Sequence, residues 1–178
     1  MGRLAYNKNM VKSLRLLWGS VLGHFLLYRL IYISLFLFIT GMFLYSFGFS
    51  NQMFWDDDDF ILKNAYVHDL TLWRNYFSEN VIAGSGLVSN YWRPILLTVF
   101  GVEWRLFGNS PVGWHLVNAL THSANAVLVF LLLRNVFKKA FVSFIAAIIF
   151  VIHPVQTEAV AYVNSFGDSL SVFFMLLG

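Results

Sequence analysis

The chain has 178 residues, of which 58% are hydrophobic, 19% are aromatic and only 12% are charged. Soluble domains average about 25% charged residues, so this composition excludes an ordinary soluble globular domain. We expect an all-α, polytopic membrane protein that contacts the lipid bilayer directly. The net charge of +3 is small, and we expect no nucleic-acid partner. The absence of cysteine excludes a disulfide framework and a thiolate metal site.

Residues 1–29 form a basic segment. Its cations are Arg3, Lys8, Lys12, Arg15 and Arg29, and it contains no acidic residue. Residues 11–28 have the pattern of a basic amphipathic helix that lies on a membrane surface. Residues 30–49 carry no charge and are long enough to cross about 30 Å of hydrocarbon, which predicts the first transmembrane helix. Because cations concentrate in cytoplasmic segments, we expect a cytoplasmic N-terminus and a location in the cytoplasmic (plasma) membrane.

Residues 50–110 are predicted to form one large loop on the outer face. Within it, Pro94–Gly108 is apolar but contains Glu103 and Arg105, and it is too short to cross a bilayer. We therefore expect an interfacial helix that begins at Pro94 and ends at Gly108.

Three more transmembrane helices are predicted, at residues 111–133, 140–152 and 158–178. The basic cluster Arg134, Lys138 and Lys139 follows the first of them and is expected in the cytoplasm. His153 and Pro154 then return the chain to the outer face. The last apolar segment is still open at Gly178, so we expect the chain to be the N-terminal part of a longer protein.

Three polar motifs share the predicted outer face and are expected to meet. They are Trp55-Asp56-Asp57-Asp58-Asp59, Tyr91-Trp92-Arg93-Pro94 and His153-Pro154-Val155-Gln156-Thr157-Glu158. Adjacent carboxylates repel one another, so at least one of the four aspartates should have a raised pKa and suit a general base. The run Asp56, Asp57, Asp58 and Asp59 can also hold a divalent cation. A solvated acidic loop or a helix cap is the simpler alternative.

The other two motifs also have two interpretations each. Arg93 can bind a phosphate bidentately, or it can anchor the interfacial helix by reaching toward the lipid head groups. His153 and Glu158 can meet across a turn as metal ligands or as an acid/base pair. Alternatively, His153 ends one helix and Glu158 begins the next, where its charge is favourable.

Polar residues also occur inside the predicted membrane helices. His115, Asn118, His122 and Asn125 fall within an arc of about 80° on one helix face. This stripe can line a substrate path, although hydrogen bonding between helices is the more frequent use and the one we favour. Asp168 lies inside the last apolar segment, where a charge is costly, and is therefore a site candidate.

Four motifs carry a family resemblance. They are Trp55-Asp56-Asp57-x-x-Phe60-Ile61-x-x-Asn64, Tyr91-x-Arg93-Pro94-Ile95, Phe107-Gly108-x-x-Pro111-x-x-x-His115-Leu116-x-Asn118-x-x-x-His122 and His153-Pro154-x-x-Thr157-Glu158-Ala159-Val160. In this order they resemble GT-C glycosyltransferases, and most closely the transmembrane, tetratricopeptide-repeat-containing O-mannosyltransferases and their bacterial relatives. The chain departs from the family at Trp92, which is inserted, and at Ser165-Phe166-Gly167-Asp168, where relatives carry Gly-Arg-x-Asp and the arginine is missing.

The resemblance implies a GT-C-like fold and transfer of a sugar from a polyprenyl-phosphate donor to a hydroxyl of a protein or glycan, with inversion. Asp56 or Asp57 is then the general base, Tyr91 lies in the same site, and Arg93 stabilises the lipid-phosphate leaving group. No cofactor is implied, and a divalent cation remains open. Two alternatives remain: a non-catalytic membrane fragment or assembly subunit, and a transporter that uses the histidine stripe and Asp168.

Overall fold

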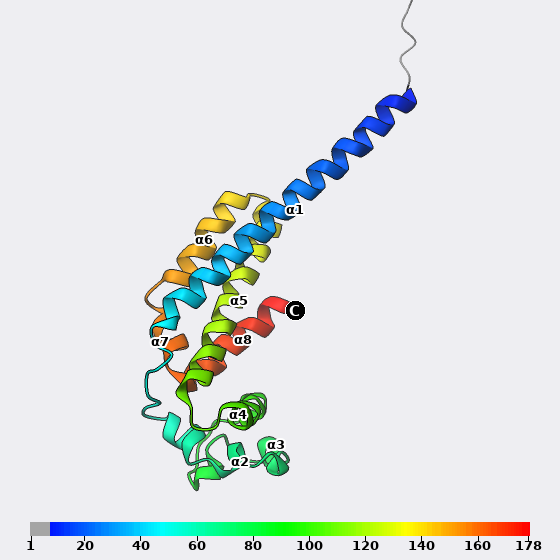
Figure 1. Cartoon of the computed structure of the whole chain (residues 1–178). Helices are drawn as coiled ribbons and strands as arrows, with labels where there is room; N and C mark the ends of the chain where they lie inside the picture. The colour runs from blue at the N-terminus through cyan, green and yellow to red at the C-terminus, as the bar shows by residue number, and fades with distance from the viewer. Residues whose placement is uncertain (1–7) are drawn as a thin grey trace, which may run out of the picture. The chain divides into compact units, whose positions relative to one another are not determined.

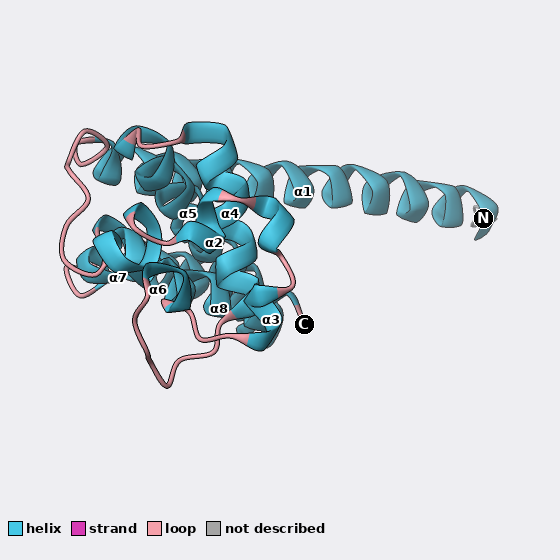
Figure 2. Ribbon diagram, turned by 90° about the horizontal axis from the view of Figure 1, so that it is seen from below, coloured by secondary structure: helices cyan, strands magenta, loops and turns pink. Residues whose placement is uncertain are grey.

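The computed structural model describes the backbone of residues 8–178 and the side chains from residue 27 onward. These residues form helices and loops without any strand, as Figure 2 shows, which confirms the all-α prediction. The chain separates into two units, up to Phe36 and from Leu37 to Gly178, and each is considered by itself. The predicted amphipathic character of residues 11–28 rests almost wholly on side chains outside the described residues.

Two helical segments of the described chain are long and apolar enough to cross a membrane. They are Leu27–Ser46, at the end of α1 (Lys8–Ser46), and the whole of α5 (Pro111–Phe137). The first ends three residues before the predicted boundary, and the second extends four residues beyond it. Pro111 starts α5 at a position where its missing N–H costs nothing, and the left-handed backbone of Lys138 ends it.

The second unit is built around α5. Helices α6 (Ala140–Ile152) and α8 (Phe166–Leu177) both pack along it, as Figure 1 shows. With 13 and 12 residues, these two helices are only about 20 Å long, which is shorter than the hydrocarbon core. The end of α5 that bears Pro111 lies toward α4, and its other end forms the turn to α6.

The predicted helix 158–178 is interrupted in the structure. It is divided into α7 (Gln156–Ala161), a 3-10 turn η4 (Val163–Ser165) and α8, with an extended residue, Tyr162, after α7. The interruption moves Asp168 from the predicted helix interior to the exposed first turn of α8. The prediction of one continuous apolar helix was therefore wrong at this point.

Residues 50–110 fold into a small helical layer at one end of α5. Its elements are η1 (Asp58–Leu62), α2 (Ala65–His68), η2 (Leu70–Leu72), α3 (Asn75–Ser78), η3 (Ala83–Ser85) and α4 (Pro94–Phe107). The expected helix from Pro94 is thus present as α4. Apolar side chains such as Ile61, Leu97 and Phe100 form its core, and the Phe100 ring meets the edge of Trp114 at 5.6 Å, which joins the layer to α5.

Asn64 holds the loop before α4 in shape. Its buried amide Nδ2 donates hydrogen bonds to the carbonyl oxygens of Phe60 and Val81, at 3.2 and 2.8 Å. Its Oδ1 accepts from the backbone N–H of Tyr66 and so caps α2. A side chain at Gly84 would collide with that oxygen, so the close packing here requires glycine.

Candidate active site

Asp57 anchors the acidic loop to the connection before α8. Its side chain is fully buried, and Oδ1 accepts a 2.8 Å hydrogen bond from the backbone N–H of Asn164. Oδ2 accepts a 3.1 Å bond from the N–H of Phe54. Burial raises the pKa of Asp57 to about 6, against the opposing effect of these two hydrogen bonds. Because both oxygens already have partners, Asp57 is built to hold two distant segments together.

Asp56 lies beside it in a different environment. Its side chain is exposed, and its backbone N–H donates a 3.1 Å hydrogen bond to the hydroxyl of Tyr162. The preceding Trp55 has a left-handed backbone with φ of 54°, which is unusual for a large side chain. The chain reverses here so that Asp57 points inward while Asp56 stays accessible.

The remaining two aspartates are also separated. Asp58 forms an ion pair of 2.9 Å with Lys63, and Asp59 faces the same cavity as Asp56. Among the residues from 27 onward, no three His, Asp or Glu side chains are placed to share a metal ion. Only Asp56 and Asp59 face one cavity, so the four carboxylates do not form the common oxygen cage that the run of aspartates suggested.

A polar cavity of about 400 Å³ brings together five of the candidate residues: Asp56, Asp59, Tyr91, Arg93 and Asp168. Its polar lining consists of Asp56, Asp59, Ser89, Tyr91, Arg93, Asn164, Ser165 and Asp168. The acidic loop, the segment before α4 and the first turn of α8 each contribute to it. The first two predicted motifs are therefore brought together, and Asp168 joins them.

Arg93 provides the positive charge of this cavity. Its guanidinium carbon lies 5.1 Å from the ring centre of Tyr91, a cation–π arrangement that fixes the side chain. In the described part of the chain, Lys63 and Asp58 form an ion pair, but no carboxylate oxygen lies within 4 Å of the Arg93 guanidinium.

The inserted Trp92 has a structural role in this segment. Its indole Nε1 donates a 3.1 Å hydrogen bond to the carbonyl oxygen of Phe77. The backbone N–H of Tyr91 donates to the hydroxyl of Ser89 at 2.9 Å. Both bonds fix the direction of the chain before α4, so that the neighbouring Arg93 faces the cavity.

An apolar cavity of about 540 Å³ lies directly beside the polar one. Trp92, Ile95, Leu170 and Phe174 provide apolar walls. Arg93 and Asp168 line both cavities, so the two meet at these side chains. The geometry suits a molecule with a polar head, a negative group next to Arg93 and a long apolar tail.

The third predicted motif does not enter the polar cavity. His153 lines a different cavity, and its Nδ1 accepts a 3.2 Å hydrogen bond from the N–H of Val155. Glu158 is exposed in the first turn of α7, where its charge is favourable. The two side chains do not form an ion pair in the structure. The arrangement matches the interpretation in which one ends a helix and the other begins one.

The polar stripe of α5 joins this helix to other segments. Each of its four side chains forms a hydrogen bond with a backbone carbonyl: His115 with Asn51, Asn118 with Val160 and Tyr162, His122 with Val151, and Asn125 with Ser169. All four side chains are buried. Asn118, His122 and Asn125 reach carbonyl groups of α7, α6 and α8, which is the hydrogen bonding between helices that we favoured, whereas His115 reaches the loop residue Asn51.

Four polar residues of the site were not among the predicted candidates: the cavity-lining serines Ser89 and Ser165, and the pair Tyr162 and Asn164. Tyr162 accepts from the backbone of Asp56, and its ring centre lies 5.1 Å from that of Phe54. Asn164 is buried at the cavity wall. The signal for Tyr162 and Asn164 was available, because a Tyr and an Asn interrupt an otherwise apolar run just before Asp168.

Fold and site together define a helical protein that combines candidate membrane-crossing helices with a polar cavity, an adjoining apolar cavity and one unpaired arginine between them. No family model and no solved structure matches the chain. Curated relatives do match, and all three described next are protein O-mannosyl-transferases.

A relative from Caenorhabditis elegans is 30% identical over 128 residues, which are 68% of this chain and 18% of the relative. One from Drosophila melanogaster is 33% identical over 127 residues, covering 69% and 15%. One from Homo sapiens is 31% identical over 148 residues, covering 73% and 20%. The chain is therefore related to the TMTC-type protein O-mannosyl-transferases, as its motifs predicted, and it spans a fifth or less of their length.

Proposed function

We propose that this protein is a membrane glycosyltransferase. It transfers a sugar from a polyprenyl-phosphate donor to a hydroxyl of a protein or glycan acceptor, with inversion. The names of the relatives support a glycosyltransferase role. The observation that carries the proposal is the contact between the polar and the apolar cavity at Arg93 and Asp168.

The two cavities match the two ends of such a donor. The sugar occupies the polar cavity, where Asp59 and Asp168 can accept hydrogen bonds from its hydroxyls. The phosphate lies beside Arg93, which is free of any carboxylate partner in the described chain. The first part of the polyprenyl chain lies in the apolar cavity along Ile95 and Leu170. Since that chain is costly to remove from lipid, the reaction takes place at the membrane surface.

Asp56 is the residue placed to act as general base. Its carboxylate is exposed at the cavity, whereas both oxygens of Asp57 are engaged. Asp56 removes the proton of the acceptor hydroxyl as that oxygen attacks the anomeric carbon. The bond from the anomeric carbon to the phosphate oxygen breaks at the same time. Arg93 stabilises the negative charge that develops on the departing lipid phosphate.

The arrangement of charges supports a membrane orientation for this reaction. The cations Arg134, Lys138 and Lys139 lie at the end of α5 opposite the small helical layer. With 27 residues α5 is about 40 Å long, enough to separate the two ends by a bilayer. We propose that the N-terminus and the basic cluster of Arg134, Lys138 and Lys139 face the cytoplasm. The polar cavity then opens on the outer face of the cytoplasmic membrane.

A transfer assay with the complete gene product in membranes tests this function. The donor is a radiolabelled polyprenyl-phosphate sugar, and the modified acceptor is identified by mass. Asp56→Asn should lower the transfer rate at least about 100-fold, because it removes the base. Asp58→Asn, which removes a neighbouring carboxylate outside the cavity, should retain most of the activity. Equal rates for wild type and Asp56→Asn would reject the proposal.

A further inference from the structure

A third cavity, of about 360 Å³, lies between the end of α1, α5 and the connection from α6 to α7. It shares no lining residue with the polar and apolar cavities of the proposed active site. Its size is in the range of small-molecule sites, about 300–1,000 Å³. Leu44, Val151, Ile152 and Val160 make most of its wall apolar.

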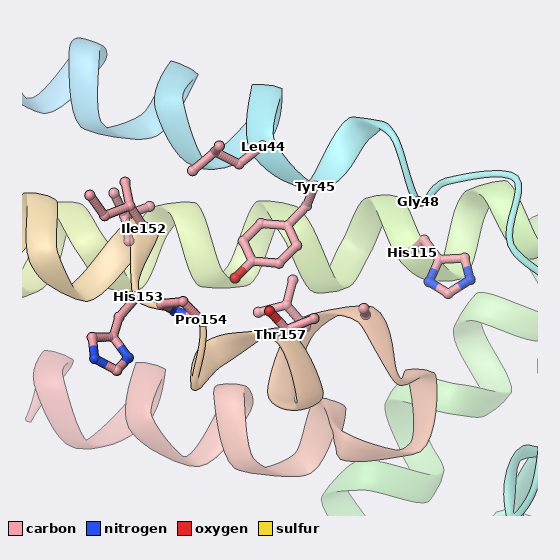
Figure 3. A pocket seen from close by; sticks show the side chains of 11 residues that line it. Leu44, Tyr45, Gly48, His115, Ile152, His153, Pro154 and Thr157 are labelled. Atoms are coloured by element: carbon pink, nitrogen blue, oxygen red, sulfur yellow. The ribbon is translucent and has the colours of Figure 1, made fainter.

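Hydroxyl groups without a protein partner face this cavity. Figure 3 shows the Tyr45 ring reaching from α1 toward Pro154 and toward Thr157 at the start of α7. In the described part of the chain, neither the Tyr45 nor the Thr157 hydroxyl forms a hydrogen bond with another protein group. Each hydroxyl can therefore donate one hydrogen bond to a bound molecule and accept others from it.

Two histidines complete the polar groups, at opposite ends of the cavity in Figure 3. The Nε2 of His115 bonds the carbonyl oxygen of Asn51 at 3.0 Å. A carbonyl only accepts, so Nε2 carries the proton and Nδ1 of the neutral ring remains an acceptor. In His153 the order is reversed, because Nδ1 accepts from the N–H of Val155 and leaves Nε2 as the donor.

The lining contains no Lys, Arg, Asp or Glu, so it offers a ligand no fixed charge. It presents several neutral hydrogen-bonding groups on an apolar wall. The apolar side chains Leu44 and Ile152 at its rim are 41% and 52% exposed, and Leu44 belongs to a candidate membrane-crossing segment. A molecule in the cavity can therefore extend an aliphatic chain along these helices into lipid.

We propose that this cavity binds an uncharged amphiphile with a hydroxyl-bearing head and an aliphatic chain, of the class of monoacylglycerols. The head hydroxyls pair with Tyr45, Thr157 and the free ring nitrogens, and the chain follows Leu44 and Ile152. The site is distinct from the proposed donor site, because the cavities share no lining residue and this one contains no Lys or Arg.

Photo-labelling of the full chain in phosphatidylcholine vesicles tests the proposal. The probe is a monoacylglycerol with a diazirine in its acyl chain. Peptides that contain Tyr45 and residues 151–161 should carry the label, and unlabelled monoacylglycerol should compete for it. The double variant Tyr45→Phe, Thr157→Val should lower labelling at least about 5-fold, because each lost hydrogen bond costs about 1 kcal/mol.

A matched control removes two hydroxyls elsewhere. Tyr32→Phe, Thr98→Val changes exposed side chains that do not line the cavity and should label like wild type. Ala161→Phe, which fills the cavity but keeps every polar group, should also abolish labelling. Independently of any variant, the monoacylglycerol should raise the melting temperature of the wild-type protein.

Three results would overturn the proposal. The first is labelling that is absent or lies on other helices. The second is labelling that survives both the hydroxyl-free and the cavity-filling variant. The third is stronger labelling of the same peptides by a phosphatidic acid probe of equal chain length, which would show that the site selects an anionic head.

Discussion

Asp56 and Asp57 are neighbours in the sequence, but their side chains lie in opposite environments. Asp57 is buried with two backbone N–H donors, and Asp56 faces the polar cavity. The sequence predicts that at least one of the four aspartates has a raised pKa, but it does not show which one is buried and which one faces the cavity. Which aspartate is buried depends on the left-handed backbone of Trp55 and on Asn164, which is 107 residues away from Asp57.

Glu103 shows how burial acts on a single residue outside the site. It lies on α4, is 3% exposed, and its Oε1 has no hydrogen-bond partner in the described chain. Burial raises its pKa from 4.5 to about 8, so the carboxyl is mostly neutral at pH 7. The sequence suggested an interfacial helix with a charge on it, whereas the structure places that group inside.

This burial predicts a pH dependence of stability. The pKa of Glu103 is higher in the folded than in the unfolded protein. Its contribution to the free energy of unfolding is therefore complete below about pH 4.5 and is lost as the pH rises through 8. Glu103→Gln should remove the loss of stability that Glu103 causes as the pH rises, and it should be more stable than wild type above pH 8. The melting temperature in detergent from pH 5 to 9 measures this difference. Glu79→Gln, an exposed control, should keep the wild-type decline, and a Glu103→Gln profile that parallels wild type would contradict the assignment.

At the scale of elements, the bounds of α4, α5 and α6 follow from local signals. Pro94 and Pro111 start their helices, Gly108 and Lys138 end α4 and α5, and Pro154 prevents α6 from continuing. No proline or glycine marks the break before α8, and Tyr162 and Asn164 do not by themselves specify a break there. The break depends on the hydrogen bond between Asp57 and the backbone of Asn164, and a contact over that separation cannot be read from an apolar run.

The hydrogen bonds of α5 can be tested by mutation. Asn118 donates to the carbonyl oxygens of Val160 and Tyr162 at 3.1 and 3.3 Å. Asn118→Ala should lower the free energy of unfolding by about 1–2 kcal/mol, because it leaves the buried carbonyl of Val160 and the partly buried carbonyl of Tyr162 without this donor. Thr121→Ala on the same helix should cost less than about 0.5 kcal/mol. Denaturant unfolding in mixed micelles measures both, and equal effects would show that the Asn118 bonds do not contribute.

At the scale of the whole molecule, the predicted convergence of three motifs was right for two of them. The acidic motif and Arg93 line the same cavity, but His153 and Glu158 do not. Placing three motifs on one predicted face of a membrane does not place them in one cavity, because His153 ends α6 beside a different cavity and Glu158 lies exposed in the first turn of α7. Asp168 reaches the cavity instead, since the break before α8 sets it in the first helical turn.

The proposed membrane orientation can be measured with single cysteines, because the chain has none of its own. Asn90 and Asn135 are both exposed, one in the small helical layer and the other in the last turn of α5, next to Arg134. In right-side-out vesicles, Asn90→Cys should react with a membrane-impermeant maleimide, and Asn135→Cys should react only after permeabilisation. Reaction of both without permeabilisation would contradict the orientation.

The central claim is that one donor molecule spans the polar and apolar cavities with its phosphate at Arg93. The most direct test compares donors with long and short polyprenyl chains in Arg93→Gln and Ile95→Asn variants of the complete gene product. Arg93→Gln should raise KM for both donors, because both carry the phosphate. Ile95→Asn should raise KM for the long-chain donor only, because Ile95 meets the chain and not the head. An Ile95→Asn effect that does not depend on chain length, or an unchanged KM in Arg93→Gln, would contradict the claim.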